Sequence, residues 1–300
     1  MTPRMTPRVT LDAIARPGGG FAMVAMDQRE SLRTMFDDAG AGRPADPVLT
    51  DFKLEVARAL GPLASGFLVD RHYGFERVRD EGLLPDGCGL ILAADELTQE
   101  DGGPVMETAL DEIVLSTDLG GVSALKLLVI WRRDELRPAR VDLARRFAEE
   151  ARARGVLSVL EPVVRATPDE EAAGTWDLDE AIREAARELS PVGADLYKVQ
   201  VPSGGRGSDD ELLARCRELA ADITGPWVVL SQGVDRDDFL RAVTTACRAG
   251  ASGFLAGRAL WSDLVGTPDL ATALREVSVP RLERLCEVVD AHARPWREAR

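Results

Sequence analysis

Histidine is scarce in this chain of 300 residues, and paired cysteine is missing. His72 and His292 are the only histidines, and no Cys-x-x-Cys pair occurs among Cys88, Cys216, Cys247 and Cys286. Zinc sites take most of their ligands from these residue types, so we expect no metal ion and no other cofactor, although carboxylate-bound magnesium stays open. Scattered cysteines are also typical of a reducing compartment, which favours the cytoplasm.

Basic residues are fewer than acidic residues, and the chain has no long apolar run. The chain has 37 Lys and Arg against 51 Asp and Glu, a formal net charge of −14. Nucleic-acid phosphates bind basic surfaces, so we expect no nucleic-acid partner. No apolar run approaches the ~20 residues that span a bilayer, and we expect no membrane partner. A small anion remains possible if a few cations gather at one place.

Eight short apolar segments, rich in β-branched residues, recur along the chain. Most are apolar throughout, which is typical of parallel strands buried on both faces. Amphipathic segments with helical spacing separate them, and we expect a short helix near residues 75–82 and a last helix over 279–293 on the outside. Thr50 is predicted to cap a helix over residues 51–60. The eight segments are residues 21–26, 65–70, 88–94, 123–130, 156–162, 194–202, 226–231 and 252–257.

This alternation predicts an α/β protein with a (β/α)8 TIM-barrel fold. No linker divides the chain, so we expect one barrel domain over residues 21–300. Residues 1–20 are expected to form an N-terminal extension without a secretory signal, and its repeated Met-Thr-Pro-Arg offers two start sites, Met1 and Met5. A doubly wound open sheet is the alternative, but no Gly-x-Gly-x-x-Gly follows the first strand.

Two predicted strands carry a lysine among apolar residues: Lys126 in the fourth and Lys198 in the sixth. Burial disfavours an ammonium and lowers a lysine pKa by roughly 3–5 units in extreme cases, and only a neutral amine attacks a ketone. We therefore predict Lys198 as a Schiff-base nucleophile with Lys126 as a cation beside it. Glu161 and Asp27, at the C-terminal ends of the fifth and first strands, are the candidates for proton transfer. The alternative, lysines that extend to solvent and pair with carboxylates, is less compatible with two lysines around one carboxylate.

Glycines and serine end the last two predicted strands. The segments LSQGV and GFLAGR place Ser231, Gly233, Gly257 and Arg258 where TIM barrels commonly bind phosphate. Free backbone N–H groups and a guanidinium are suited to a phosphate. A single glycine-rich turn usually only reverses the chain, but two on adjacent strands favour a phosphate site.

Several segments together resemble the tagatose-1,6-bisphosphate aldolase-like class I aldolases. They are most similar to the bacterial 6-deoxy-6-sulfofructose-1-phosphate aldolases of sulfoglycolysis, and the resemblance extends from about residue 20 to about residue 292. The segments are MVAMDQRESLRTMF, TDFKLEVAR, LLVIWRRDE, LSVLEPVVR, ADLYKVQVP, WVVLSQGVD and AGASGFLAGRALW.

The resemblance implies roles for individual residues. The family's Schiff-base lysine lies in an Asp-x-x-Lys-Val-x-x-Pro segment, which corresponds here to residues 195–202 and implies Lys198. Its acid/base glutamate precedes proline, which implies Glu161, and its strand-four lysine matches Lys126. The Asp-Gln-Arg-Glu motif implies Asp27 and Gln28. The family's phosphate-binding segments match Ser231, Gly233, Gly257 and Arg258.

The implied activity is that of a lyase. The substrate would be a phosphorylated sulfosugar, 6-deoxy-6-sulfofructose 1-phosphate, cleaved reversibly to dihydroxyacetone phosphate and 3-sulfolactaldehyde during sulfoquinovose degradation in the cytoplasm. Arg29, Arg71 and His72 are candidates for the C6 sulfonate. We also expect a homo-oligomer. Two alternatives stay open: a tagatose or fructose 1,6-bisphosphate aldolase, and a non-catalytic sugar-phosphate-binding regulator on the same barrel, which would have no need of buried lysines.

Overall fold

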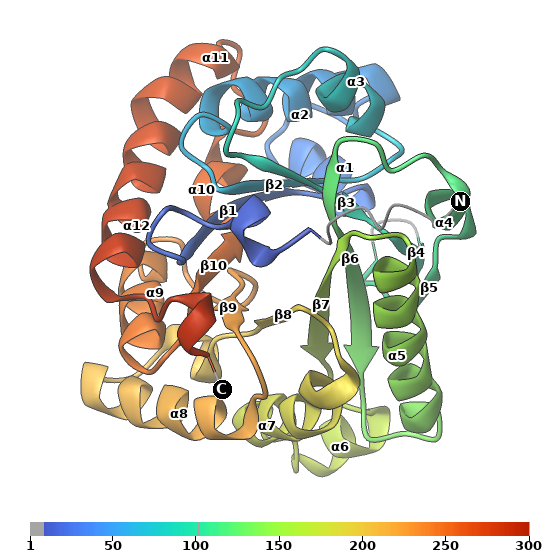
Figure 1. The fold of residues 1–300 in the computed structure, drawn as a ribbon, viewed down its shortest axis with the longest axis vertical. Helices are drawn as coiled ribbons and strands as arrows, with labels where there is room; N and C mark the ends of the chain where they lie inside the picture. Colours follow the sequence, from blue (N-terminus) through green and yellow to red (C-terminus); the bar gives the residue numbers. More distant parts are fainter. Residues whose placement is uncertain (1–8, 101–102, 300) are drawn as a thin grey trace, which may run out of the picture.

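Eight parallel strands close into a barrel with helices around it (Figure 1). The structure is a computed structural model that describes residues 9–100 and 103–299. Around the barrel the strands follow the order β1-β10-β9-β8-β7-β6-β3-β2. This closed barrel confirms the predicted (β/α)8 fold and excludes the doubly wound sheet. The strands are β1 (Phe21–Met26), β2 (Gly66–Val69), β3 (Gly89–Ala93), β6 (Val122–Trp131), β7 (Leu157–Val164), β8 (Leu196–Val199), β9 (Trp227–Val229) and β10 (Gly253–Ala256).

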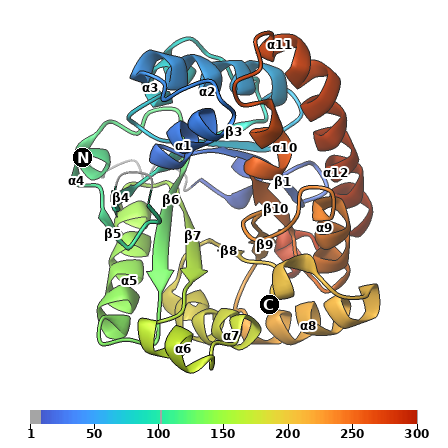
Figure 2. The ribbon, with the colours of Figure 1, turned by 180° about the vertical axis from the view of Figure 1, so that it is seen from behind.

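The helices form the outer layer, and the view from behind in Figure 2 shows them on the outside of the strands again. The last long helix, α12 (Val279–His292), lies on the outside, as predicted, and packs against α9 (Phe239–Arg248). A short α3 follows β2 in the predicted place. The other helices are α1 (Glu30–Asp38), α2 (Asp46–Leu60), α3 (Phe75–Asp80), α4 (Glu112–Ser116), α5 (Arg137–Ala153), α6 (Pro168–Ala173), α7 (Leu178–Leu189), α8 (Asp209–Asp222), α9 (Phe239–Arg248), α10 (Arg258–Trp261) and α11 (Leu270–Ala273).

Helix α2 begins earlier than the sequence indicated. Its N-cap position is Ala45, and the helix starts at Asp46, so Thr50 lies inside it. Proline in the first turn explains the early start, because Pro47 stands where a helix makes no use of the missing N–H. The prediction of Thr50 as a helix cap is therefore wrong.

Two further strands form a hairpin that the sequence did not reveal. β4 (Asp95–Thr98) and β5 (Glu107–Leu110) pair antiparallel directly after β3, outside the barrel sheet. The hairpin carries few buried apolar residues, and its middle positions are partly exposed. It therefore lacks the apolar pattern from which the barrel strands were predicted. Its importance is its position, because residues of its connection line the cavity described below.

The N-terminal extension contributes to the barrel core. Residues 11–14 form a 3-10 turn in which Leu11 is 6% and Ile14 0% exposed. Both pack with inward-facing residues of the first strands, among them Phe21 and Leu68. The described part of the extension thus covers one end of the barrel interior. The alternative start sites, Met1 and Met5, lie outside the described residues.

Candidate active site

The barrel interior changes from apolar to charged at the C-terminal ends of its strands. Side chains along a strand point alternately to the two faces. The inward-facing residues Ala25, Ala93, Ala124, Val159 and Leu196 belong to one buried apolar cluster. The next inward-facing residue lies two positions further toward the C-terminus, and it is charged in all five cases. These residues are Asp27, Asp95, Lys126, Glu161 and Lys198.

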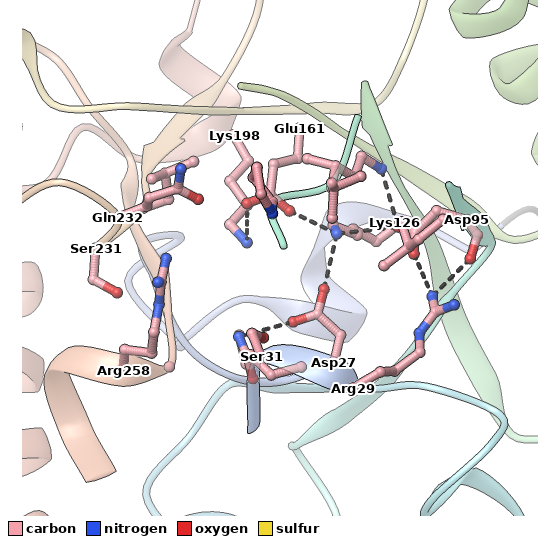
Figure 3. Close-up of a pocket in the computed structure, with 18 of the residues that line it drawn as sticks. Asp27, Arg29, Ser31, Asp95, Lys126, Glu161, Lys198, Ser231, Gln232 and Arg258 are labelled. Carbon is pink, nitrogen blue, oxygen red and sulfur yellow. Dashed lines mark hydrogen bonds and ion pairs between the residues drawn. The ribbon is translucent and has the colours of Figure 1, made fainter. Parts of the chain in front are cut away.

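Two buried lysines share one carboxylate in this charged layer (Figure 3). Glu161 Oε1 lies 2.8 Å from Lys198 Nζ, and its Oε2 lies 2.8 Å from Lys126 Nζ. All three residues are buried: Lys126 is 2%, Lys198 3% and Glu161 8% exposed. Because Lys126, Glu161 and Lys198 come from the consecutive barrel strands β6, β7 and β8, the closed sheet positions the three side chains. The carboxylate therefore lies within hydrogen-bonding distance of both amines.

Lys126 is held as a cation by three carboxylates. Its Nζ lies 2.8 Å from Asp27 Oδ2 and 3.1 Å from Asp95 Oδ2, in addition to Glu161. Burial disfavours the ammonium, but the carboxylates outweigh burial and hold the pKa of Lys126 well above its ordinary value. Lys126 therefore places a positive charge next to the carboxylate that also contacts Lys198.

Asp27 is held as an anion by the same lysines. Burial alone would raise the pKa of its carboxyl, but Lys126 and Lys198 outweigh burial and hold that pKa well below its ordinary value. Its second oxygen, Oδ1, accepts a hydrogen bond of 3.2 Å from Gln28 Nε2. A carboxylate that ionises so readily is a weak base.

Asp95 is a site residue that the sequence reasoning missed. It is 2% exposed, and its Oδ2 accepts from the Leu128 N–H at 3.1 Å as well as from Lys126. Its Oδ1 pairs with Arg29 Nη2 at 2.6 Å. The signal is present in the sequence, because Asp95 follows the third apolar segment as Asp27 follows the first.

A cavity of about 300 Å³ opens above the lysines. Most of the predicted substrate-binding residues line it: Gln28, Ser231, Gly257 and Arg258 do, together with all four predicted catalytic residues. Gly233 is the exception, since it is not among the lining residues although its neighbour Gln232 is. Further lining residues that the sequence did not indicate are Ser31, Leu97, Gln99, Gly103, Pro104, Val105, Leu128 and Arg165.

Ser231, Gln232 and Arg258 lie together on the side of Lys198 opposite Asp95 and Arg29 (Figure 3). Gly257 is required where β10 approaches β1, because a Cβ there would lie 2.4 Å from the Ala25 carbonyl oxygen. The buried Gln28 Oε1 has no hydrogen-bond partner within the described part of the chain, although it borders the cavity. It is available to accept a hydrogen bond from a ligand hydroxyl.

Two of the three candidates for a C6 anion lie away from this cavity. Arg71 pairs with Asp111 at 2.5 Å, and the Nδ1 of His72 lies 3.6 Å from Asp70. Neither is among the lining residues, whereas Arg29 lines the cavity but is paired with Asp95.

The described residues contain no group of three or more His, Cys, Asp or Glu side chains that could hold a metal ion. All four cysteines are free and buried. Over residues 9–100 and 103–299, no helix combines the length and apolarity needed to cross a membrane.

Comparisons with known proteins identify the family of this chain. The chain matches the DeoC/LacD family aldolases over residues 21–263. It belongs to that family. It is therefore a class I aldolase, and so a lyase, as the sequence predicted.

Curated relatives cover nearly the whole chain. It is 28% identical to a tagatose 1,6-diphosphate aldolase of Listeria monocytogenes, over 95% of this chain and 92% of the relative. It is 26% identical to tagatose 1,6-diphosphate aldolase 2 of Streptococcus pyogenes, over 93% and 94% of the two chains.

Solved aldolase structures share the fold. The fructose-bisphosphate aldolase of Plasmodium falciparum superposes with a TM-score of 0.68 at 15% identity, covering 94% of this chain and 93% of that one. That of Slackia heliotrinireducens gives a TM-score of 0.61 at 19% identity, with 92% and 88% covered.

Proposed function

We propose that Lys198 is the Schiff-base nucleophile of this aldolase and that Glu161 is its acid/base partner. The observation that carries the proposal is the Glu161 carboxylate between two buried amines, 2.8 Å from each. Because Lys126 is held as a cation by its other carboxylates, Lys198 is the amine that can give up its proton to Glu161 and become neutral.

The reaction then follows from ordinary imine chemistry. The neutral Lys198 amine adds to the C2 ketone and forms a carbinolamine. Glu161 then returns the proton to the carbinolamine hydroxyl, which departs as water and leaves an iminium. A base takes the proton of the C4 hydroxyl, the C3–C4 bond breaks, and its electrons enter the iminium to give an enamine and an aldehyde. Protonation of the enamine at C3 and hydrolysis of the new iminium release the second product and restore the amine. We assign these proton transfers to Glu161, which is within reach of the Lys198 nitrogen.

Lys126 and Asp27 support this step electrostatically. A cation 2.8 Å from the Glu161 carboxylate disfavours a second ammonium at Lys198. Asp27 fixes Lys126 in place and orients Gln28 through its other oxygen. The unpartnered Gln28 Oε1 supplies an acceptor for a sugar hydroxyl.

A phosphate on C1 would bind on the side of Lys198 where Ser231, Gly257 and Arg258 line the cavity. Arg258 carries no ion pair to any described carboxylate, so its guanidinium is available for a bidentate contact to phosphate oxygens. Gly233, one residue beyond the lining, would contribute through the backbone of the same turn. Together these residues form the proposed phosphate site.

We propose 6-deoxy-6-sulfofructose 1-phosphate as the substrate, cleaved to dihydroxyacetone phosphate and 3-sulfolactaldehyde. The motif resemblance described above supports this choice. A tagatose or fructose 1,6-bisphosphate is the second candidate, and it is supported by the two bacterial relatives, which are tagatose 1,6-diphosphate aldolases. Both substrates carry a C1 phosphate, a C2 ketone and an anion at C6, so the same catalytic residues serve either.

Measured kcat/KM values for the two kinds of substrate separate the candidates. We expect the sulfosugar phosphate to be cleaved with the larger kcat/KM, and a larger value for a bisphosphate would replace it as the substrate. Lys198→Arg should abolish cleavage of both, and turnover that survives this change would contradict the mechanism. A homo-oligomer stays a prediction that light scattering on the purified protein tests.

A further inference from the structure

The cavity is positively charged although the whole chain is acidic. Five cationic and four anionic side chains line it. Three of the cations are neutralised by carboxylates of the same site: Arg29 by Asp95, Lys126 by three partners, and Lys198 by Glu161. The two remaining cations are Arg258 and Arg165, and neither has an ion-pair partner among residues 9–100 and 103–299. Arg258 belongs to the proposed phosphate site, so the charge of Arg165 remains unexplained.

Arg165 is fixed at the end of β7 but keeps its side chain free. It follows Val164 directly, and its backbone N–H donates to the Trp131 carbonyl at 3.0 Å, which continues the β6–β7 pairing. Burial lowers the pKa of its guanidinium, and the nearby charge of Arg132 acts in the same direction. Within the described part of the chain, no carboxylate offsets these effects. A partly buried guanidinium without a counter-ion is unfavourable, and an anionic group of a ligand would relieve that cost.

The two arginines nearest to Arg165 at the strand ends do have carboxylate partners. Arg132 pairs with Glu107 at 3.1 Å, and Arg133 pairs with Glu170 at 2.7 Å and with Glu184. Neither Arg132 nor Arg133 lines the cavity above the lysines. Of these three neighbouring arginines, the two outside the cavity have carboxylate partners, and Arg165, which borders the cavity, has none among the described residues.

The position of Arg165 matches the far end of a bound sugar. Arg258 follows β10 and Arg165 follows β7, with β9 and the Lys198 strand β8 between them in the barrel order. Three strand spacings of ~4.8 Å separate β7 and β10 by on the order of 14 Å around the barrel. Two long arginine side chains at this separation can reach both ends of a six-carbon sugar whose ketone lies at Lys198.

We infer that Arg165 binds the anionic group on C6 of the substrate, and so distinguishes sugars charged at both ends from those charged only at C1. The inference rests on the proposed function, since it takes the ketone at Lys198 and the C1 phosphate at Arg258 as given. It replaces Arg71 and His72, which lie outside the cavity, and Arg29, which is already neutralised by Asp95.

The test compares Arg165→Met and Arg165→Lys with wild type, and uses Arg132→Met as the matched control. Arg132 is an adjacent arginine that lies outside the cavity. Cleavage is measured with the better of the two C6-anionic substrates and with fructose 1-phosphate, which has an uncharged C6. We expect Arg165→Met to lower kcat/KM for the C6-anionic substrate by about 10- to 100-fold, the range for hydrogen bonds to a charged group, and that for fructose 1-phosphate by less than about threefold. Arg165→Lys should lose less, because it keeps the charge but not the forked geometry, and Arg132→Met should leave the ratio of the two kcat/KM values unchanged.

An equal loss on both substrates, or no loss, would overturn the inference, as would the same selective loss in Arg132→Met. If the thermal unfolding curve shows that Arg165→Met does not fold, Arg165→Lys tests the inference instead. Its ratio of kcat/KM for the C6-anionic substrate to kcat/KM for fructose 1-phosphate must then be lower than that of wild type. A wild-type protein that cleaves fructose 1-phosphate as well as the C6-anionic sugars would refute the role of Arg165 alone. One that cleaves none of these sugars would refute the proposed function itself.

Discussion

Replacing Lys126 with methionine removes the cation that joins three carboxylates. In the structure its Nζ lies 2.8, 3.1 and 2.8 Å from oxygens of Asp27, Asp95 and Glu161, and all three would remain in the buried layer without it. At an effective dielectric constant of ~20, one such contact is worth about 6 kcal/mol before desolvation is subtracted. Measured losses on breaking a buried ion pair are about 3–5 kcal/mol, and we expect Lys126→Met to lower the free energy of unfolding by that amount at pH 8.

The loss should depend on pH with a definite sign. In the wild type, the lowered pKa of Asp27 gives stability that is present above its unfolded pKa and is lost as pH falls through its folded pKa. In Lys126→Met the unpaired carboxylates take up protons more readily in the folded state. The loss of stability caused by their charges is therefore largest at high pH, where all of them are ionised. The deficit relative to wild type should therefore shrink as the pH is lowered from 8 to 5.

Urea unfolding followed by circular dichroism at pH 8 and pH 5 measures both deficits. Lys198→Met is the matched control: it also removes a buried ammonium, but Lys198 has one carboxylate partner, and Glu161 would keep Lys126. We expect it to lose all turnover while its stability falls by no more than about 3 kcal/mol. A deficit for Lys126→Met below about 1 kcal/mol at pH 8, or one that is the same at both pH values, would refute the reasoning.

Three further predictions follow from buried contacts. Gly257→Ala should lower the free energy of unfolding by about 1–3 kcal/mol in chemical denaturation, because its Cβ would lie 2.4 Å from the Ala25 oxygen; wild-type stability would show that the strands can separate there. Lys53→Met leaves the fully buried Asp70 without its ion pair and should lower the free energy of unfolding by about 3–5 kcal/mol in the same assay. The double variant Lys53→Met/Asp70→Asn should recover part of this loss, and no recovery would exclude the unpaired Asp70 charge as its cause. Burial raises the thiol pKa to about 12 at Cys88, Cys216 and Cys247 and to about 11 at Cys286. A disulfide reagent at pH 8 should therefore modify none of the four thiols in the native protein and all four after unfolding, and rapid labelling of the native protein would contradict their burial.

The barrel was predictable because its strands are buried on both faces. Such strands have continuous apolar runs, and a strand overlaps each of the eight predicted segments, although β6 and β7 extend one or two residues beyond theirs. The β4–β5 hairpin was not predictable from the same pattern, because it lies outside the barrel and is partly exposed. The start of α2 depended on Pro47 rather than on a capping hydroxyl, so the search for a cap led to Thr50.

The candidate site was predictable as far as it depends on strand ends. Lys126, Glu161 and Lys198 stand out as charges within apolar strands, and the structure brings all three into contact. Asp95 carries the same signal at the end of β3. Arg165 could not be singled out from the sequence, because what distinguishes it is the lack of a carboxylate partner. That depends on where Glu107 and Glu170 lie in space, and they pair with its neighbours.

Reduction of the protein with borohydride in the presence of dihydroxyacetone phosphate tests the central claim most directly. If the Lys198 amine forms an iminium with the ketone, reduction should fix one adduct per chain, and peptide mass spectrometry should locate it on Lys198. Lys126→Met should still form the adduct more slowly, whereas Lys198→Arg should form none. An adduct on Lys126, or none at all in a wild-type protein that cleaves its substrate, would contradict the account.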